Sequence, residues 1–236
     1  MNGVITTENV YEKKDELLKQ INEYKITDAV KSVTNPEPRT YGSEDHKYKV
    51  ALFDFGYKRN IRNELVNRGC EVIVVPANTT AEQIKEIAPD GIMFSNGPGD
   101  PSENTEVIKN IREIAQLGIP IFGICLGHQL MALAHGATTQ KLKYGHRGAN
   151  QPVIDKALGK TFVTSQNHGY AVVGESMDPE IGEVSHINAN DGTCEGMRYK
   201  NINAFTVQFH PEAHGGPQDT AYLFDEFIEM IKKEMH

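Results

Sequence analysis

The feature that most constrains the fold of this chain is a single cysteine between two glycines. Cys125 lies in the segment F-G-I-C-L-G-H-Q, which spans residues 122–129. An apolar run at residues 119–124 predicts a strand before the cysteine, and residues 128–135 predict a helix after it. The flanking glycines permit the sharp turn that such an elbow needs. A cysteine at this turn would face the positive end of the helix dipole, which favours the reactive thiolate.

A second segment, V-Q-F-H-P-E at residues 207–212, supplies the partners that a nucleophilic cysteine needs. It lies at the end of a strand-like run at residues 202–209. His210 would accept the thiol proton, and Glu212 would fix the imidazole tautomer through a hydrogen bond. The sequence therefore predicts a triad of Cys125, His210 and Glu212. The alternatives are a buried structural cysteine and a simple surface turn, and neither explains the paired glycines.

The rest of the chain alternates apolar strands with amphipathic helices. Strands are expected at residues 50–53, 71–75 and 91–94, and helices at residues 58–68, 81–87, 105–116 and 219–234. This alternation predicts an α/β fold, an open and mostly parallel sheet with helices on both faces, with a more β-rich stretch at residues 138–206. Ligands bind beyond the carboxyl ends of parallel strands, so Ser95, Cys125 and His210 are expected to converge.

Composition excludes several other classes of protein. The formal net charge of −8 argues against nucleic acid as the main partner. No apolar run is long enough to cross a membrane, and the charged first residues do not resemble a secretory signal. Three cysteines without a framework spacing fit a reducing compartment, so we expect a cytoplasmic protein in which Cys70 and Cys194 are structural.

The two motifs together resemble those of class I, triad-type glutamine amidotransferases, and the resemblance extends from about Tyr48 to the C-terminus. Four further segments resemble the glutaminase domain of the carbamoyl phosphate synthetase small subunit: F-D-F-G-Y-K-R-N-I, S-N-G-P-G-D-P, K-Y-G-H-R-G-A-N-Q-P-V and S-Q-N-H-G-Y-A-V. Such subunits carry an N-terminal domain before the glutaminase domain. We therefore expect residues 1–46 to be a remnant of an upstream domain plus a linker, and residues 47–236 to be the glutaminase domain.

The resemblance implies hydrolysis of glutamine through a thioester on Cys125. It also implies substrate contacts at Gly97, Gly99, Leu126, Gln129, Asn167, Gly169 and Tyr170. The backbone N–H groups of Leu126 and Gly99 would stabilise the oxyanion. Simple turns at Gly97–Gly99 and Asn167–Gly169, and a helix-capping role for Gln129, are the alternatives.

The partners implied by the resemblance are L-glutamine and a large synthetase subunit that makes carbamoyl phosphate. ATP and Mg²⁺ are expected on that subunit. No cofactor is expected in this chain, because it has no Walker-type loop. No metal is expected either, because His128, His146 and His168 fit no zinc spacing. A glutaminase of anthranilate or GMP synthase, or a non-catalytic binding module on the same fold, stays open.

Overall fold

The computed structural model describes residues 2–43, 45–216 and 218–235. The helices in these ranges are α1 (Lys14–Glu23), α2 (Arg59–Asn67), α3 (Ala81–Ile87), α4 (Thr105–Ile114), α5 (Leu126–Ala134) and α6 (Tyr222–Glu234). The strands are β1 (Arg39–Tyr41), β2 (Tyr48–Asp54), β3 (Cys70–Pro76), β4 (Gly91–Phe94), β5 (Ile121–Ile124), β6 (Thr138–Asp155), β7 (Lys160–Val173), β8 (Gly182–Asn188), β9 (Cys194–Tyr199) and β10 (Ala204–Val207). Within the described ranges, no helix combines the length and apolarity needed to cross a membrane.

All the strands just named form one mixed sheet in the order β1-β3-β2-β4-β5-β10-β9-β8-β6-β7. Neighbours from β3 to β10 in this order pair in parallel. The pairs outside that block are antiparallel. The carboxyl ends of β2, β4, β5 and β10 therefore open on one edge of the sheet, where parallel α/β sheets bind their ligands.

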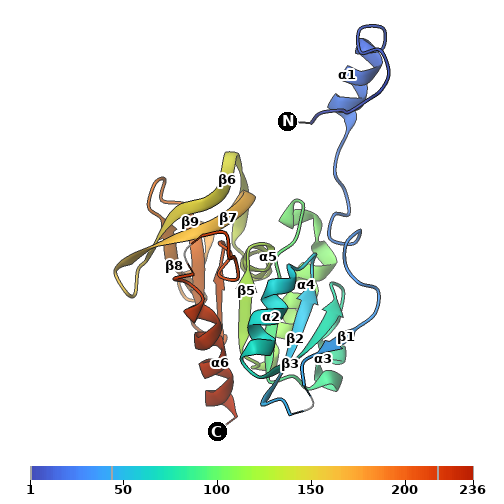
Figure 1. The fold of residues 1–236 in the computed structure, drawn as a ribbon. Helices are drawn as coiled ribbons and strands as arrows, with labels where there is room; N and C mark the ends of the chain where they lie inside the picture. Colours follow the sequence, from blue (N-terminus) through green and yellow to red (C-terminus); the bar gives the residue numbers. More distant parts are fainter. Residues whose placement is uncertain (1, 44, 217, 236) are drawn as a thin grey trace.

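Helices cover both faces of the parallel strands (Figure 1). Ala51 and Phe53 of β2 join a core with α3, α4 and α5, whereas Val50 and Leu52 join a core with α2 and α6. This alternation follows from the two-residue period of a strand that is buried on both faces. In the second core, the ring of Phe122 on β5 stacks 4.4 Å from that of Phe205 on β10. It also lies edge-on to Phe224 of α6, at 5.5 Å.

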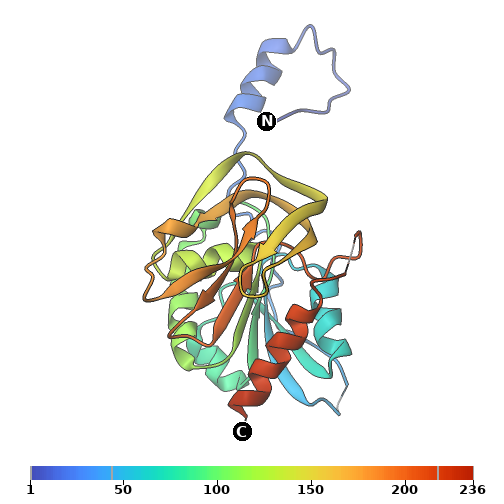
Figure 2. The same ribbon diagram turned by 90° about the vertical axis from the view of Figure 1, so that its left-hand side faces the viewer.

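The antiparallel half is dominated by the long β6–β7 hairpin, which ends the strand order and lies in the upper part of the body in Figures 1 and 2. The pairing shifts register between Lys141 and His146 and again between Gly148 and Gln151. Gly145 has a φ of +71°, and a Cβ there would lie 2.2 Å from the carbonyl oxygen of His168. A glycine is therefore required where β6 approaches β7 this closely.

The N-terminal part has two structural regions. Figure 1 shows α1 apart from the body of the molecule, and Leu17 is its one buried residue. Residues 28–36, by contrast, pack on the body: Val30 is 3% exposed and belongs to the first core. The backbone N–H of Asn35 donates at 3.0 Å to Oδ2 of Asp54, the last residue of β2. The expected division of the chain at residues 46 and 47 stays a prediction.

The predicted fold class, an open sheet with helices on both faces, is confirmed. Every strand and helix expected from the pattern of apolar residues occurs, with ends shifted by a few residues. The stretch at residues 138–206 forms β6 to β9 and the start of β10, so half of the sheet is antiparallel. Its irregular register explains why no clear period could be read there.

Replacement of Phe122 by alanine tests whether the β5–β10–α6 contact anchors the fold. Because the ring is fully buried among Phe205, Phe224 and Phe227, Phe122→Ala should lower the free energy of unfolding by about 3–5 kcal/mol. Urea unfolding measures this change. The control is Leu158→Ala, at a residue that is 52% exposed, and it should leave stability nearly unchanged. Equal stabilities for the two variants would contradict this packing.

Candidate active site

Cys125 joins β5 to α5 at a strained turn. Its φ is +54° and its ψ is −102°, a conformation that a non-glycine residue adopts at a cost of about 1–3 kcal/mol. The Cys125 N–H donates to the carbonyl of Val207 on β10 at 2.8 Å, which fixes the turn to the neighbouring strand. A Cβ on Gly127 would lie 2.3 Å from the Phe94 carbonyl oxygen, so only glycine lets α5 begin against the end of β4. The predicted elbow is present.

His210 and Glu212 form a buried pair. His210 Nδ1 lies 2.8 Å from Glu212 Oε1, and the two residues are 4% and 2% exposed. Burial by itself lowers the pKa of His210. The charge of Cys125 and its hydrogen bond to the ring, together with Glu212, outweigh burial and raise the pKa to about 9. At neutral pH the imidazole is therefore protonated, with Nδ1–H directed at the carboxylate.

Glu212 is held by α2 as well as by His210. Lys58 Nζ lies 3.6 Å from Glu212 Oε1, and the side-chain amide of Asn60 donates to the Glu212 carbonyl. Burial raises the pKa of the Glu212 carboxyl, but His210 and Lys58 outweigh it, so the net direction is downward. The carboxylate therefore stays ionised although it is buried, as orientation of a charged imidazole requires.

Cys125 and His210 both line a cavity of about 620 Å³ at the carboxyl ends of the parallel strands. The other predicted site residues in this lining are Gly97, Gly99, Gln129, Asn167, Gly169 and Tyr170. Glu212 and Leu126 are outside it, at 2% and 1% exposed. The structure thus brings the predicted residues together, with Glu212 behind His210 and the Leu126 side chain in the first core.

The two residues predicted to supply oxyanion donors border the cysteine or its cavity: Leu126 follows Cys125 directly, and Gly99 lines the cavity. Leu126 is the first residue of α5, so its N–H has no partner within the helix. Gly99, on the loop after β4, has a φ of +94°, which favours glycine there. A Cβ on Gly97 would lie 2.2 Å from the Phe55 carbonyl oxygen. The glycines therefore let the loop pack closely against its neighbours and line the cavity with backbone.

A further part of the cavity lining is a segment of β7, residues 167–170, which we name the wall. Gln129 of α5 donates through Nε2 to the Tyr170 carbonyl at 2.8 Å and to Gln208 Oε1 at 2.8 Å. Gln129 therefore links the helix of the cysteine to the wall, and its side chain does not cap its own helix. His168 Nδ1 lies 2.7 Å from the same carbonyl.

The remaining buried histidines and cysteines are neutral. Burial lowers the pKa of His128 to about 3 and that of His168 to about 4. His128 is bound to Thr206 Oγ1 through Nδ1 at 2.8 Å. Burial raises the pKa of both Cys70 and Cys194 to about 12, so neither thiol ionises at neutral pH.

One group of side chains in the described ranges has the composition of a metal site. Donor atoms of His146, His168 and Glu195 lie within 4.8 Å of one another. Each nitrogen of His146 already faces a carboxylate, Asp191 at 2.9 Å and Glu195 at 3.2 Å. This arrangement is that of a charged imidazole between two acids.

Val33, Lys58 and Arg147 are among the cavity-lining residues that sequence reasoning did not name as site residues. Lys58 follows β2, whose carboxyl end meets the same edge as β4 and β5, so the strand-end rule could have found it. Arg147 lies between the two register shifts of β6, and no sequence pattern predicts such shifts. Val33 comes from the segment that was expected to be a linker.

Comparisons with known proteins agree with this geometry. A family model described as glutamine amidotransferase class-I matches residues 51–230. Carbamoyl phosphate synthase small chains of Bacillus cereus and Staphylococcus epidermidis are 52% and 53% identical over 216 and 219 residues. Each alignment covers 92% of this chain, whereas the chain spans only 58% and 59% of those relatives' length.

A solved structure shares the fold. The crystal structure of a putative GMP synthase subunit protein from Thermoplasma acidophilum superposes with a TM-score of 0.71 and 22% identity. The match covers 80% of this chain and 96% of that chain. At this identity, the likeness concerns the fold alone.

The charge on His210 can be tested without any substrate. In Glu212→Gln, the carboxylate that favours the protonated ring is gone, so the pKa of His210 should fall from about 9 toward the ordinary histidine range. Titration of the His210 ring signals by NMR measures this. Glu64→Gln is the control, because that carboxylate pairs with Arg68 within α2. An unchanged His210 pKa in Glu212→Gln would show that the pair does not set the charge.

Proposed function

We propose that this chain, which belongs to the class-I glutamine amidotransferase family, hydrolyses the side-chain amide of L-glutamine to glutamate and ammonia. One observation carries the proposal. Cys125, on a strained strand-to-helix turn, lines the same cavity as His210, and the buried Glu212 is paired with His210. A nucleophile, a proton carrier and its orienting acid are the minimum set for acyl transfer from an amide.

In the first half of the reaction, the Cys125 thiolate attacks the amide carbon and forms a tetrahedral oxyanion. His210 then donates its Nε2 proton to the amide nitrogen, the carbon–nitrogen bond breaks, and ammonia leaves. A glutamyl thioester stays on Cys125. Glu212 keeps Nδ1–H bonded throughout, so that Nε2 is the nitrogen that loses and regains the proton.

In the second half, His210 removes a proton from water, and the hydroxide attacks the thioester carbon. A second oxyanion forms, the carbon–sulfur bond breaks, and glutamate leaves. The N–H groups of Leu126 and Gly99 are the proposed oxyanion donors, each worth about 3–4 kcal/mol of transition-state stabilisation in comparable sites. The wall and Gln129 would hold the substrate, and the cations Lys58 and Arg147 favour its α-carboxylate.

The ammonia is proposed to pass to a large synthetase subunit that makes carbamoyl phosphate and binds ATP and Mg²⁺. The two relatives at 52% and 53% identity, both named carbamoyl phosphate synthase small chain, support this destination. These relatives favour carbamoyl phosphate synthesis over anthranilate or GMP synthesis as the use of the ammonia.

Replacement of Cys125 by serine tests the hydrolysis. Cys125→Ser should lower ammonia release from glutamine by at least about a thousandfold, because a neutral hydroxyl replaces the thiolate. Cys70→Ala is the matched control, since its thiol is buried and neutral, and it should keep the wild-type rate. If Cys125→Ser retains the wild-type rate, the triad does not perform the reaction. If neither wild type nor Cys125→Ser releases ammonia, the result would favour the non-catalytic binding module.

Delivery to a synthetase subunit is tested by mixing the purified chain with a carbamoyl phosphate synthase large chain, bicarbonate, ATP and Mg²⁺. Carbamoyl phosphate should form from glutamine, and Cys125→Ser should remove that formation while leaving the ammonia-dependent reaction intact. Formation from added ammonia alone, together with active glutamine hydrolysis, would contradict delivery to this partner.

A further inference from the structure

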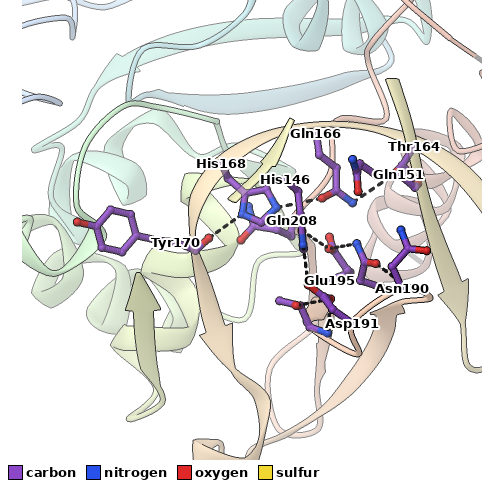
Figure 3. Close-up of polar contacts among 12 residues, drawn as sticks. His146, Gln151, Thr164, Gln166, His168, Tyr170, Asn190, Asp191, Glu195 and Gln208 are labelled. Atoms are coloured by element: carbon purple, nitrogen blue, oxygen red, sulfur yellow. Dashed lines mark hydrogen bonds and ion pairs between the residues drawn. The ribbon is translucent and has the colours of Figure 1, made fainter. Parts of the chain in front are cut away.

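Behind the wall lies a group of charged and polar side chains that the reaction does not use (Figure 3). We name His146, Asp191 and Glu195 the clamp. Its members come from three places in the antiparallel half: β6, the turn between β8 and β9, and β9. Glu195 is 0% exposed, and the side chain of His146 is 12% exposed. A carboxylate this deeply buried needs a partner of opposite charge.

His146 is bound on both sides by acids. Its Nε2 lies 2.9 Å from Asp191 Oδ2, and its Nδ1 lies 3.2 Å from Glu195 Oε1. The Nε2 contact is a hydrogen bond to a carboxylate, and the Nδ1 contact is an ion pair, so the two acids together favour a positive charge on the ring. Asn188 Nδ2 also donates to Glu195 Oε1 at 3.1 Å, and the backbone N–H of Thr193 donates to Asp191 Oδ1 at 3.0 Å. Both acids are therefore also held by hydrogen bonds that do not involve the histidine.

The pKa direction of His146 agrees with that charge. Its contact with Glu195 is the main reason that the pKa of His146 rises to about 9, with Asp191 adding to it and burial opposing it. Burial raises the pKa of Glu195 on balance, because the contacts with His146 and Asn188 offset burial only in part.

His146 contacts the wall through His168. The two residues are directly paired between β6 and β7, and their rings are perpendicular at a centroid distance of 4.9 Å (Figure 3). His168 directs Nδ1 at the Tyr170 carbonyl, which can only accept, so Nδ1 carries the hydrogen of the neutral ring. Gln166 Oε1 lies 3.0 Å from Nε2. In the neutral ring Nε2 can only accept, so this contact becomes a hydrogen bond when the Gln166 amide turns its nitrogen toward the ring.

The charge of His146 disfavours a second positive charge on His168. Burial is the main reason that the pKa of His168 is low, and the positive charge of His146 lowers it further. A neutral His168 donates only to the Tyr170 carbonyl. The same carbonyl receives the hydrogen bond from Gln129 on the helix that begins at Cys125. Contacts therefore run from the clamp through His168 and Tyr170 to the helix of the nucleophile.

We propose that His146, charged between Asp191 and Glu195, is a positioning residue for glutamine binding, which it supports by holding His168 and the wall at a fixed distance from Cys125. The predicted effect on glutamine binding rests on the proposed function. The predicted effect on the order of the wall is independent of that function. His146 is not among the residues that line the cavity, so its loss should weaken glutamine binding and leave the reaction at Cys125 intact.

The test compares His146→Gln, Glu195→Gln and the double variant with wild type. His146→Gln leaves Glu195 buried without its cationic partner and can fail to fold. The double variant removes both charges and avoids that cost, so it is the decisive protein. Glu226→Gln is the matched control. Glu226 lies on α6, away from the wall, and its carboxylate pairs at 2.6 Å with Arg198 of β9.

Hydrogen exchange at residues 166–171 reads out the wall without any turnover. The double variant should exchange there at least about tenfold faster than wild type, with exchange of the α6 amides unchanged. In the glutaminase assay, the KM for glutamine should rise about tenfold or more, while kcat stays within about threefold. Unchanged exchange and KM in a folded double variant would overturn the proposal. A fall in kcat with unchanged KM would overturn it as well.

Two further arms separate the competing explanations. The KM of wild type should be the same after dialysis against EDTA and after addition of Zn²⁺. A rise in KM with EDTA, reversed by Zn²⁺, would make the cluster a metal site and overturn the charged-histidine account. Absence of glutamine hydrolysis in wild type, with faster wall exchange in the double variant, would sink the proposed function and leave the positioning of the wall supported.

Discussion

The structure depends on the close approach of three neighbouring strand ends, which only glycine permits. Gly127 lets α5 begin against the carbonyl of Phe94, and the Cys125 N–H is bound to Val207 of β10. The turn at Cys125 is strained, and the surrounding packing holds it in that conformation. The sulfur is thereby placed among the ends of β4, β5 and β10, where the glycine loop and His210 also lie.

Burial has opposite consequences for the histidines around this turn. His210 has an ionised acid at 2.8 Å and stays charged, whereas His168 has only a carbonyl and an amide as hydrogen-bond partners and stays neutral. His146 is charged because it lies between two acids. The region around the cavity therefore contains a proton carrier, a neutral hydrogen-bond donor and a buried ion cluster. Each state follows from the nearest acid and not from burial alone.

The sequence was sufficient to predict the fold class and the convergence of Cys125, His210 and Glu212. Strand-end positions and the glycine elbow depend on local backbone rules that a single chain displays. The clamp could not be predicted, because His146, Asp191 and Glu195 meet only through the irregular register of β6 and the turn before β9. Val33 was missed for a related reason: residues 28–36 read as a linker, yet they pack on the core.

The most direct measurement is acid quenching during turnover with glutamine, followed by peptide mass spectrometry. The account predicts a glutamyl group bound as a thioester to the peptide that contains Cys125, and none on the peptides of Cys70 or Cys194. Ammonia production with the acyl group on another residue, or with no covalent intermediate under conditions that preserve thioesters, would contradict it.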